Sequence, residues 1–173
     1  MTPRVRKPKW GLNAFKPLRN AIVKVKWLYF TKIWGMDIHP TANFSLSAKL
    51  DRTNPKGVHI GAETYIAFDA AILTHDLSRG LYLDTRIGKR CFIGARSIIL
   101  PGIEIGDECV IGSGSVVTKN VPSRSLAAGN PARILKSDIK IIARYGRMER
   151  PDEAPDTKGS NILTGLENTF EQH

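Results

Sequence analysis

One stretch of the sequence decides the fold: IGKRCFIGARSIILPGIEIGDECVIGSGSVV, residues Ile87 to Val117. An aliphatic side chain returns at every sixth position, and these positions are Ile87, Ile93, Ile99, Ile105, Ile111 and Val117. A period of six is a multiple of the strand period of two and does not match the helical period of about 3.6. The stretch therefore predicts short strands separated by turns, and chance is a poor explanation for six uninterrupted returns.

The same repeat extends toward the N-terminus, with interruptions. Aliphatic or aromatic residues fall at Ile38, Phe44 and Leu50, and again at Ile60, Ile66 and Ile72. Glycine often follows the repeated residue, and we expect it to supply the unusual φ of a turn. A small residue usually comes four positions after it, which fits a narrow, filled interior. Because a six-residue unit cannot bury its face alone, successive turns must stack, so the sequence predicts an all-β solenoid.

Two motifs follow the repeat: IGSGSVVTKNVP, Ile111 to Pro122, and AAGNPARILK, Ala127 to Lys136. They resemble the hexapeptide-repeat acyltransferases, which read IG-[AS]-GSVVTK-x-[IV]-P and then G-N-P-A-[KR]. The resemblance covers roughly residues 37–136 and is closest to the galactoside, maltose and polysaccharide O-acetyltransferases. It implies a left-handed parallel β-helix of triangular section with three hexapeptides per coil. Ile87 then stacks under Ile105, Ile93 under Ile111 and Ile99 under Val117.

Two spacings break the repeat, and this coil size places both at one corner. Leu50 to Ile60 is four residues too long, and Ile72 to Ile87 is nine too long. Each excess follows the third hexapeptide of a coil, so two loops lie side by side. The shorter loop carries Asp51, Arg52 and Asn54, and His75 stands at the base of the longer one. Because chemistry concentrates on loops held by a rigid scaffold, this corner is the predicted active site.

His75 is the candidate catalytic residue. A lone histidine is more often structural or solvated, but its place at the root of the longest loop favours function. The resemblance implies a general base there, and histidine suits the removal of a hydroxyl proton near neutral pH. Relatives often have proline after this histidine, whereas Asp76 follows here, which leaves the orienting partner of His75 open. We expect Asp51, Asn54 and Asp76 to contact the acceptor.

The resemblance also assigns a coenzyme A groove. The residues carried over for the pantetheine tunnel are Ala95, Ser113, Thr118 and Lys119, and those for the nucleotide phosphates are Arg133 and Lys136. Arginine and lysine suit phosphates, and the backbone N–H of Ala95 is the expected oxyanion donor. The alternative is that Gly129, Asn130 and Pro131 form only a terminal turn. The preceding repeat favours the groove.

The sequence predicts no functional disulfide and no metal site among the cysteines and histidines. Cys91 and Cys109 are eighteen residues apart and stack in adjacent coils. We expect small inward-facing fillers, although the spacing also permits a disulfide. No catalytic metal is expected, because the histidines, His39, His59, His75 and His173, include no close pair.

The two ends of the chain differ in charge. Residues 1–36 hold nine Lys or Arg and no acid, whereas residues 149–173 hold two basic and six acidic residues. Apolar residues at 18, 22, 25, 29 and 33 predict a helix from Leu18 to Trp34. It either caps the open end of the solenoid or lies on a membrane, and a plain solvated end is the alternative for the basic arm as a whole. Ser137 is expected to cap a short helix from Asp138 to Tyr145, before an acidic disordered tail. The expected parts are thus 1–36, 37–136 and 137–173.

Together these features predict an acetyl-CoA-dependent O-acetyltransferase that acts on a sugar or saccharide hydroxyl. The resemblance suggests surface-polysaccharide or lipopolysaccharide biosynthesis, and a homotrimer with sites between neighbouring prisms. A nucleotide-sugar N-acetyltransferase and a non-catalytic assembly subunit are the alternatives. Two cysteines, no secretory signal and no long apolar run predict a cytoplasmic protein. A basic arm could favour anionic lipid, nucleic acid or phosphorylated ligands, and we expect no nucleic-acid partner. The basic arm leaves open a peripheral contact with the inner face of the membrane.

Overall fold

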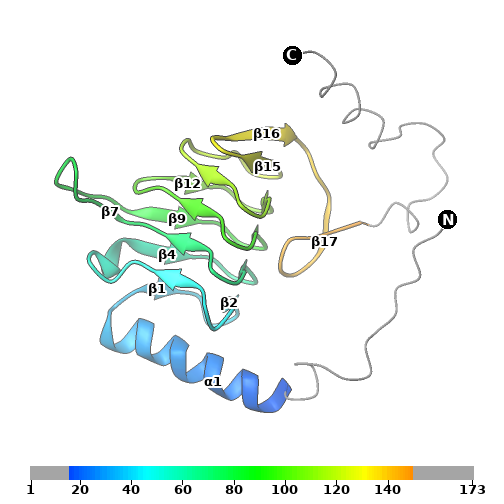
Figure 1. Ribbon diagram of the computed structural model, residues 1–173. Coiled ribbons are helices and arrows are strands. Elements are labelled where there is room, and N and C mark those ends of the chain that lie inside the picture. The colour runs from blue at the N-terminus through cyan, green and yellow to red at the C-terminus, as the bar shows by residue number, and fades with distance from the viewer. Residues whose placement is uncertain (1–15, 150–173) are drawn as a thin grey trace.

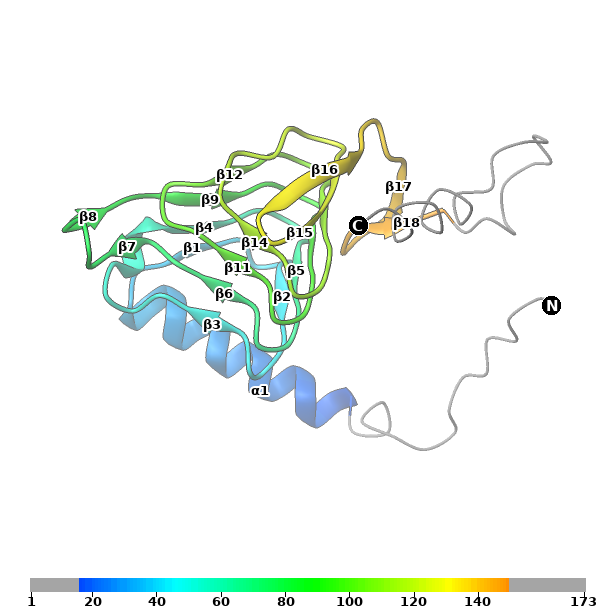
Figure 2. The same ribbon diagram turned by 45° about the horizontal axis from the view of Figure 1, so that its top comes forward.

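The computed structural model describes residues 16–149, which form a prism of stacked coils (Figure 1). Three parallel sheets make its sides, and consecutive strands of one coil fall in different sheets. Sheet A contains β1 (Asp37–Ile38), β4 (Val58–Ile60), β9 (Thr85–Ile87) and β12 (Glu104–Ile105). Sheet B contains β2 (Asn43–Phe44), β5 (Tyr65–Ile66), β10 (Phe92–Ile93), β13 (Val110–Ile111), β15 (Leu126–Gly129) and the antiparallel β16 (Ala132–Lys136). Sheet C contains β3 (Lys49–Leu50), β6 (Ala71–Ile72), β11 (Ile98–Ile99) and β14 (Val116–Val117), stacked as Figure 2 shows.

The repeated aliphatic residues fill the prism in the predicted register. Ile87 pairs with Ile105, Ile93 with Ile111 and Ile99 with Val117. All six of these side chains are buried. Small residues fill the space beside them, and the set includes Cys91 and Cys109, whose thiols are buried and free. The expectation that the cysteines are fillers is therefore confirmed.

The glycines of the repeat have a different role from the one expected. A Cβ at Gly88 would lie 2.7 Å from the backbone of Gly106 in the next coil, so glycine permits the close approach of coils. The positive φ falls two residues later, on charged side chains such as Arg90 (53°) and Glu108 (58°). These two residues form an ion pair between adjacent coils. An ion pair thus links these two turns, and the glycines allow adjacent coils to stack closely.

A helix closes one end of the prism, as one of the two alternatives predicted. It comprises α1 (Lys16–Leu28) and one π-helical turn, η2 (Tyr29–Ile33), and lies across the first coil (Figure 1). Phe30 packs on Phe44 with ring centroids 5.8 Å apart, and Trp27 Nε1 donates to the Ile38 carbonyl at 3.0 Å. Lys26 Nζ donates to carbonyls of the first coil at 2.6 and 3.2 Å. No helix within residues 16–149 is long and apolar enough to cross a membrane.

The predicted C-terminal helix is wrong. Residues 137–149 instead contain an antiparallel hairpin of β17 (Ile141–Ala143) and β18 (Arg147–Met148). Ile139 and Ile141 are buried and alternate with exposed residues, which is the period of a strand. Gly146, at φ 62°, lies so close to Phe92 that a Cβ would stand 2.5 Å away. The hairpin thus covers the outer face of sheet B, and this contact decides the local structure.

Candidate active site

The two long loops lie together at the corner between sheets C and A, as the spacing predicted. The first loop, residues 51–57, ends in a 3₁₀ turn, η3 (Pro55–Gly57). The second, residues 73–84, is a hairpin of β7 (His75–Asp76) and β8 (Leu81–Tyr82), which projects from the prism in Figure 2. Asn54 Nδ2 donates to the Thr74 carbonyl at 3.0 Å, and Thr74 Oγ1 donates to the Asn54 carbonyl at 2.7 Å. The loops therefore form one hydrogen-bonded unit.

His75 is held by Asp51 from the neighbouring loop. Its Nδ1 lies 2.5 Å from Asp51 Oδ2. The same carboxylate oxygen accepts the backbone N–H groups of Thr74 at 2.9 Å and His75 at 3.1 Å, while Oδ1 accepts the N–H of Thr53 at 2.9 Å. Asp51 is 8% exposed. Backbone N–H groups hold both of its carboxylate oxygens in addition to the contact with the imidazole.

The ionisation of Asp51 fixes the tautomer of His75. Burial alone would raise the pKa of Asp51, but the hydrogen bonds from Thr74, His75 and Thr53 outweigh it and lower that pKa to about 2. The carboxylate is therefore charged at neutral pH and can only accept hydrogen bonds. Nδ1 of His75 must then donate, which leaves the lone pair on Nε2. The His75 side chain is 28% exposed, so Nε2 can receive a proton from a bound substrate.

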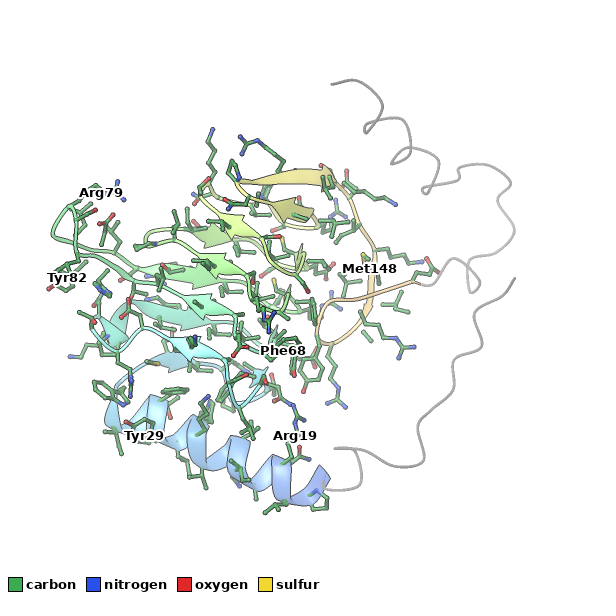
Figure 3. The ribbon with its side chains drawn as sticks, in the orientation of Figure 1. Arg19, Tyr29, Phe68, Arg79, Tyr82 and Met148 are labelled. Atoms are coloured by element: carbon green, nitrogen blue, oxygen red, sulfur yellow. The ribbon has the colours of Figure 1, made fainter. Side chains whose placement is uncertain are left out.

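The three residues expected to contact an acceptor make other contacts. Asp51 orients His75, and Asn54 ties the two loops together. Asp76 accepts hydrogen bonds from the Ser78 hydroxyl at 2.6 Å and from Arg79 Nε at 2.6 Å, and these lower its pKa to about 2. Asp76 therefore shapes the hairpin tip. Arg79 and Tyr82 project from this tip (Figure 3), and Tyr82 pairs directly across from His75.

The proposed coenzyme residues fall at two different corners of the prism. Ala95 and Ser113 stack at the corner between sheets B and C, where the Ala95 carbonyl accepts the N–H of Gly114 at 2.8 Å. Thr118 and Lys119 follow β14 at the corner between sheets C and A, the corner of His75. One whole side of the prism thus separates the Ala95 corner from the His75 corner.

Two of the three cationic residues meet at the end of the prism distant from α1. Lys119 and Arg133 both line a pocket of about 270 Å³ beside β16. Lys136 is exposed at the end of β16, where it pairs with Leu126. Arg133, an expected phosphate ligand, thus lies beside Lys119, which was expected in the pantetheine tunnel, whereas the other expected phosphate ligand, Lys136, does not line this pocket.

Residues 84–119 match the family described as the hexapeptide repeat of succinyl-transferase. YvoF of Bacillus subtilis (strain 168), a provisionally named acetyltransferase, is 36% identical over 123 residues, which are 68% of this chain and 69% of that protein. The chain belongs to the hexapeptide-repeat acyltransferases. Its enzyme class is therefore acyltransferase.

Two further relatives of this acyltransferase are named for sugars. The galactoside O-acetyltransferase of Escherichia coli (strain K12) is 34% identical over 118 residues, or 63% of this chain and 57% of that protein. The crystal structure of a maltose O-acetyltransferase from Clostridium difficile 630 is 25% identical, with a TM-score of 0.54, over 72% of this chain and 84% of that one. The shared fold is the left-handed parallel β-helix that the resemblance implied.

The other histidines of this acyltransferase lie away from the corner site. His39 Nδ1 contacts the Thr41 hydroxyl at 2.9 Å, and His59 lies on sheet A, 3.0 Å from Asp37 and 3.2 Å from Asp84. His173 is outside the described residues. Within residues 16–149, no three His, Cys, Asp or Glu side chains gather as metal ligands.

Proposed function

We propose that this acyltransferase moves the acetyl group of acetyl-CoA to the hydroxyl of a sugar or saccharide. The observation that carries the proposal is the His75–Asp51 pair, because it leaves Nε2 of a partly exposed histidine free to accept a proton beside a projecting hairpin. The galactoside and maltose enzymes support a sugar hydroxyl as the acceptor. We extend the proposal to the biosynthesis of surface polysaccharide or lipopolysaccharide.

The chemistry needs one proton to move and one acyl bond to be exchanged. Nε2 of His75 takes the hydroxyl proton as the acceptor oxygen attacks the thioester carbonyl. Asp51 stabilises the imidazolium that forms. The tetrahedral intermediate then collapses and expels the coenzyme A thiolate, which recovers the proton from His75. The negative charge on the intermediate's oxygen requires a donor, and the Ala95 backbone N–H is assigned that role.

A second copy of the chain would bring that donor to His75. A side of the prism is six residues long and spans up to about 20 Å in extended chain. The Ala95 corner of one chain therefore does not reach the His75 corner of the same chain. When prisms stand side by side, the Ala95 corner of one chain would face the His75 corner of the next chain. We propose a homotrimer, in which cyclic symmetry builds three such sites.

The coenzyme would then lie between two prisms. Ala95 and Ser113 of one chain and Thr118 and Lys119 of the next would line the pantetheine arm. Arg133, with Lys119 beside it, and Lys136 would hold the nucleotide phosphates, because cationic side chains on exposed loops bind phosphate oxygens. The free thiols of Cys91 and Cys109 fit a reducing compartment, so we place the reaction in the cytoplasm.

The acceptor would bind against the β7–β8 hairpin. Tyr82 lies opposite His75 in the hairpin register and is 66% exposed, so its ring can cover an apolar sugar face while its hydroxyl stays polar. Arg79 stands at the same tip and adds donors. We expect the better acceptors to be sugars whose apolar face can stack on the Tyr82 ring while the reacting hydroxyl lies at His75.

Thiol release from acetyl-CoA tests the function. We expect release to rise severalfold above the hydrolytic background with one class in a panel of galactosides, maltose, longer saccharides, amino sugars and serine, and the acetyl ester to be detected by mass spectrometry. Alkaline lability of the product separates an ester from an amide. Exclusive acetylation of an amine would establish the N-acetyltransferase alternative. No release with any member would favour a non-catalytic subunit.

A further inference from the structure

The helix that caps the prism has a second apolar face, and its side chains are exposed. The buried face carries Val23 and Phe30. The neighbouring face carries the sequence stripe expected to pack inward, and its members are exposed by 38 to 72%: Leu18, Ile22, Val25, Tyr29 and Ile33. The helix thus caps the solenoid with one face and exposes an apolar stripe beside it, which we call the outer stripe.

Basic side chains border the outer stripe. Lys24 and Lys32 are exposed on the same helix. Lys49 and Arg52, from the first coil and its loop, line a pocket of about 330 Å³ together with Tyr29. Between residues 16 and 50 the sequence contains one acidic residue, Asp37, which contacts His59 on sheet A. The stripe therefore lies in a cationic surround.

We propose that the outer stripe docks this protein on an anionic phospholipid surface. A helix with an apolar face and basic flanks lies in the plane of a bilayer, where the apolar side chains enter the headgroup boundary and the cations meet lipid phosphates. Charge complementarity favours this occupant over a second copy, because pairing two outer stripes would bring two cationic surrounds together. Residues 1–16 carry five further Lys and Arg in the sequence.

Docking in this way places the candidate site near the lipid surface. The α1 helix crosses one end of the prism, and His75 and Asp51 belong to the first two coils above it (Figure 1). Coils are separated by about 4.8 Å, the spacing of paired strands. The β7–β8 hairpin would thus face acceptors held at the membrane. The docking itself goes beyond the proposed function and does not depend on acyl transfer.

Vesicle co-sedimentation of the full chain, without acetyl-CoA, tests the docking. We expect binding to phosphatidylcholine vesicles with about a third phosphatidylserine, and at least tenfold weaker binding to phosphatidylcholine alone. The double variant Val25→Gln/Ile33→Gln replaces exposed side chains, so folding should persist, and its affinity for the anionic vesicles should fall by about tenfold or more. The matched control Ile142→Gln/Met148→Gln changes exposed apolar residues of the C-terminal hairpin and should bind as the unmodified chain does.

Three results would overturn the proposal. The first is equal vesicle binding by the outer-stripe variant and the control. The second is a stripe variant with a smaller mass in sedimentation equilibrium and no vesicle binding by the unmodified chain, which would assign the stripe to copy–copy contact. The third is vesicle binding that appears only after removal of residues 150–173, which would make the acidic tail the occupant of the stripe. None of these results depends on whether the protein acetylates a sugar.

Discussion

The variant His75→Ala is expected to lower kcat for acetyl transfer by about 10²–10⁴-fold, because it removes the proposed base for the acceptor proton. The KM for acetyl-CoA should change little, since the coenzyme residues lie in other segments. The side chain is partly exposed at a loop, so the variant should fold. Initial rates of thiol release at saturating acetyl-CoA measure the effect.

The matched control for this variant is His59→Ala. His59 is also a partly exposed histidine between carboxylates, but it lies on the outer face of sheet A and contacts Asp37 and Asp84. Its replacement should leave the rate within about twofold, because its contacts with Asp37 and Asp84 include neither His75 nor Asp51. A His75→Ala enzyme that also stays within twofold would remove His75 from the mechanism.

The variant Asp51→Asn is expected to lower kcat by about 10²-fold, since the imidazolium formed in the transition state loses its counter-charge. The amide cannot reproduce the carboxylate's contacts, because its NH₂ group must face either the Thr53 N–H or the oxygen position that holds His75 and Thr74. Single-turnover rates and the KM for acetyl-CoA separate a chemical defect from a binding defect. Circular dichroism verifies the fold.

Asp76→Asn provides the control for Asp51→Asn. Asp76 is also a carboxylate in the corner loops, and its pKa is likewise lowered, but its partners are Ser78 and Arg79 at the hairpin tip. We expect its replacement to affect the acceptor KM more than kcat. If Asp51→Asn retained full kcat, Asp51 would hold the loops together without assisting His75.

Periodicity predicted the interior of this protein because one physical constraint repeats. Every sixth residue must fill the same narrow prism, so the spacing of Ile93 and Ile111 is enough to predict that they stack. The loop corner was predictable for the same reason, since extra residues in a closed coil can leave only where the coil turns. The number of residues between the repeated aliphatic positions is therefore enough to predict that His75 and the Asp51 loop lie together.

The direction of side chains was harder to predict. The sequence predicted that the Asp51 loop lies beside His75, but it did not predict the orientation of the Asp51 carboxylate. Three backbone N–H groups fix that orientation. The helix carries two apolar stripes, and the more regular one, with Ile22 and Val25, faces outward. Periodicity identifies an apolar face without saying what covers it.

The prediction for the C-terminal segment failed for a related reason. Ser137 and Gly146 have the spacing of helix-capping residues, yet Tyr145 and Gly146 both adopt positive φ in a hairpin turn. The Tyr145 N–H donates to the Glu63 carbonyl at 2.7 Å, and its ring lies 5.8 Å from Tyr65 on sheet B. These tertiary contacts outweigh the local propensity, and no local pattern in the sequence indicates them.

Subunit complementation tests most directly the claim that two chains build one acetyl-transfer site around His75. The variant His75→Ala removes the base, and Ser113→Trp fills the opposite corner at an exposed residue, so each homo-oligomer should be inactive. In trimers assembled at random from equal amounts of both, about a quarter of all interfaces pair an intact His75 with an intact groove. The account predicts recovery of about a quarter of the unmodified rate of thiol release upon such mixing. Mixtures no more active than the separate variants, in oligomers shown to contain both chains, would contradict it.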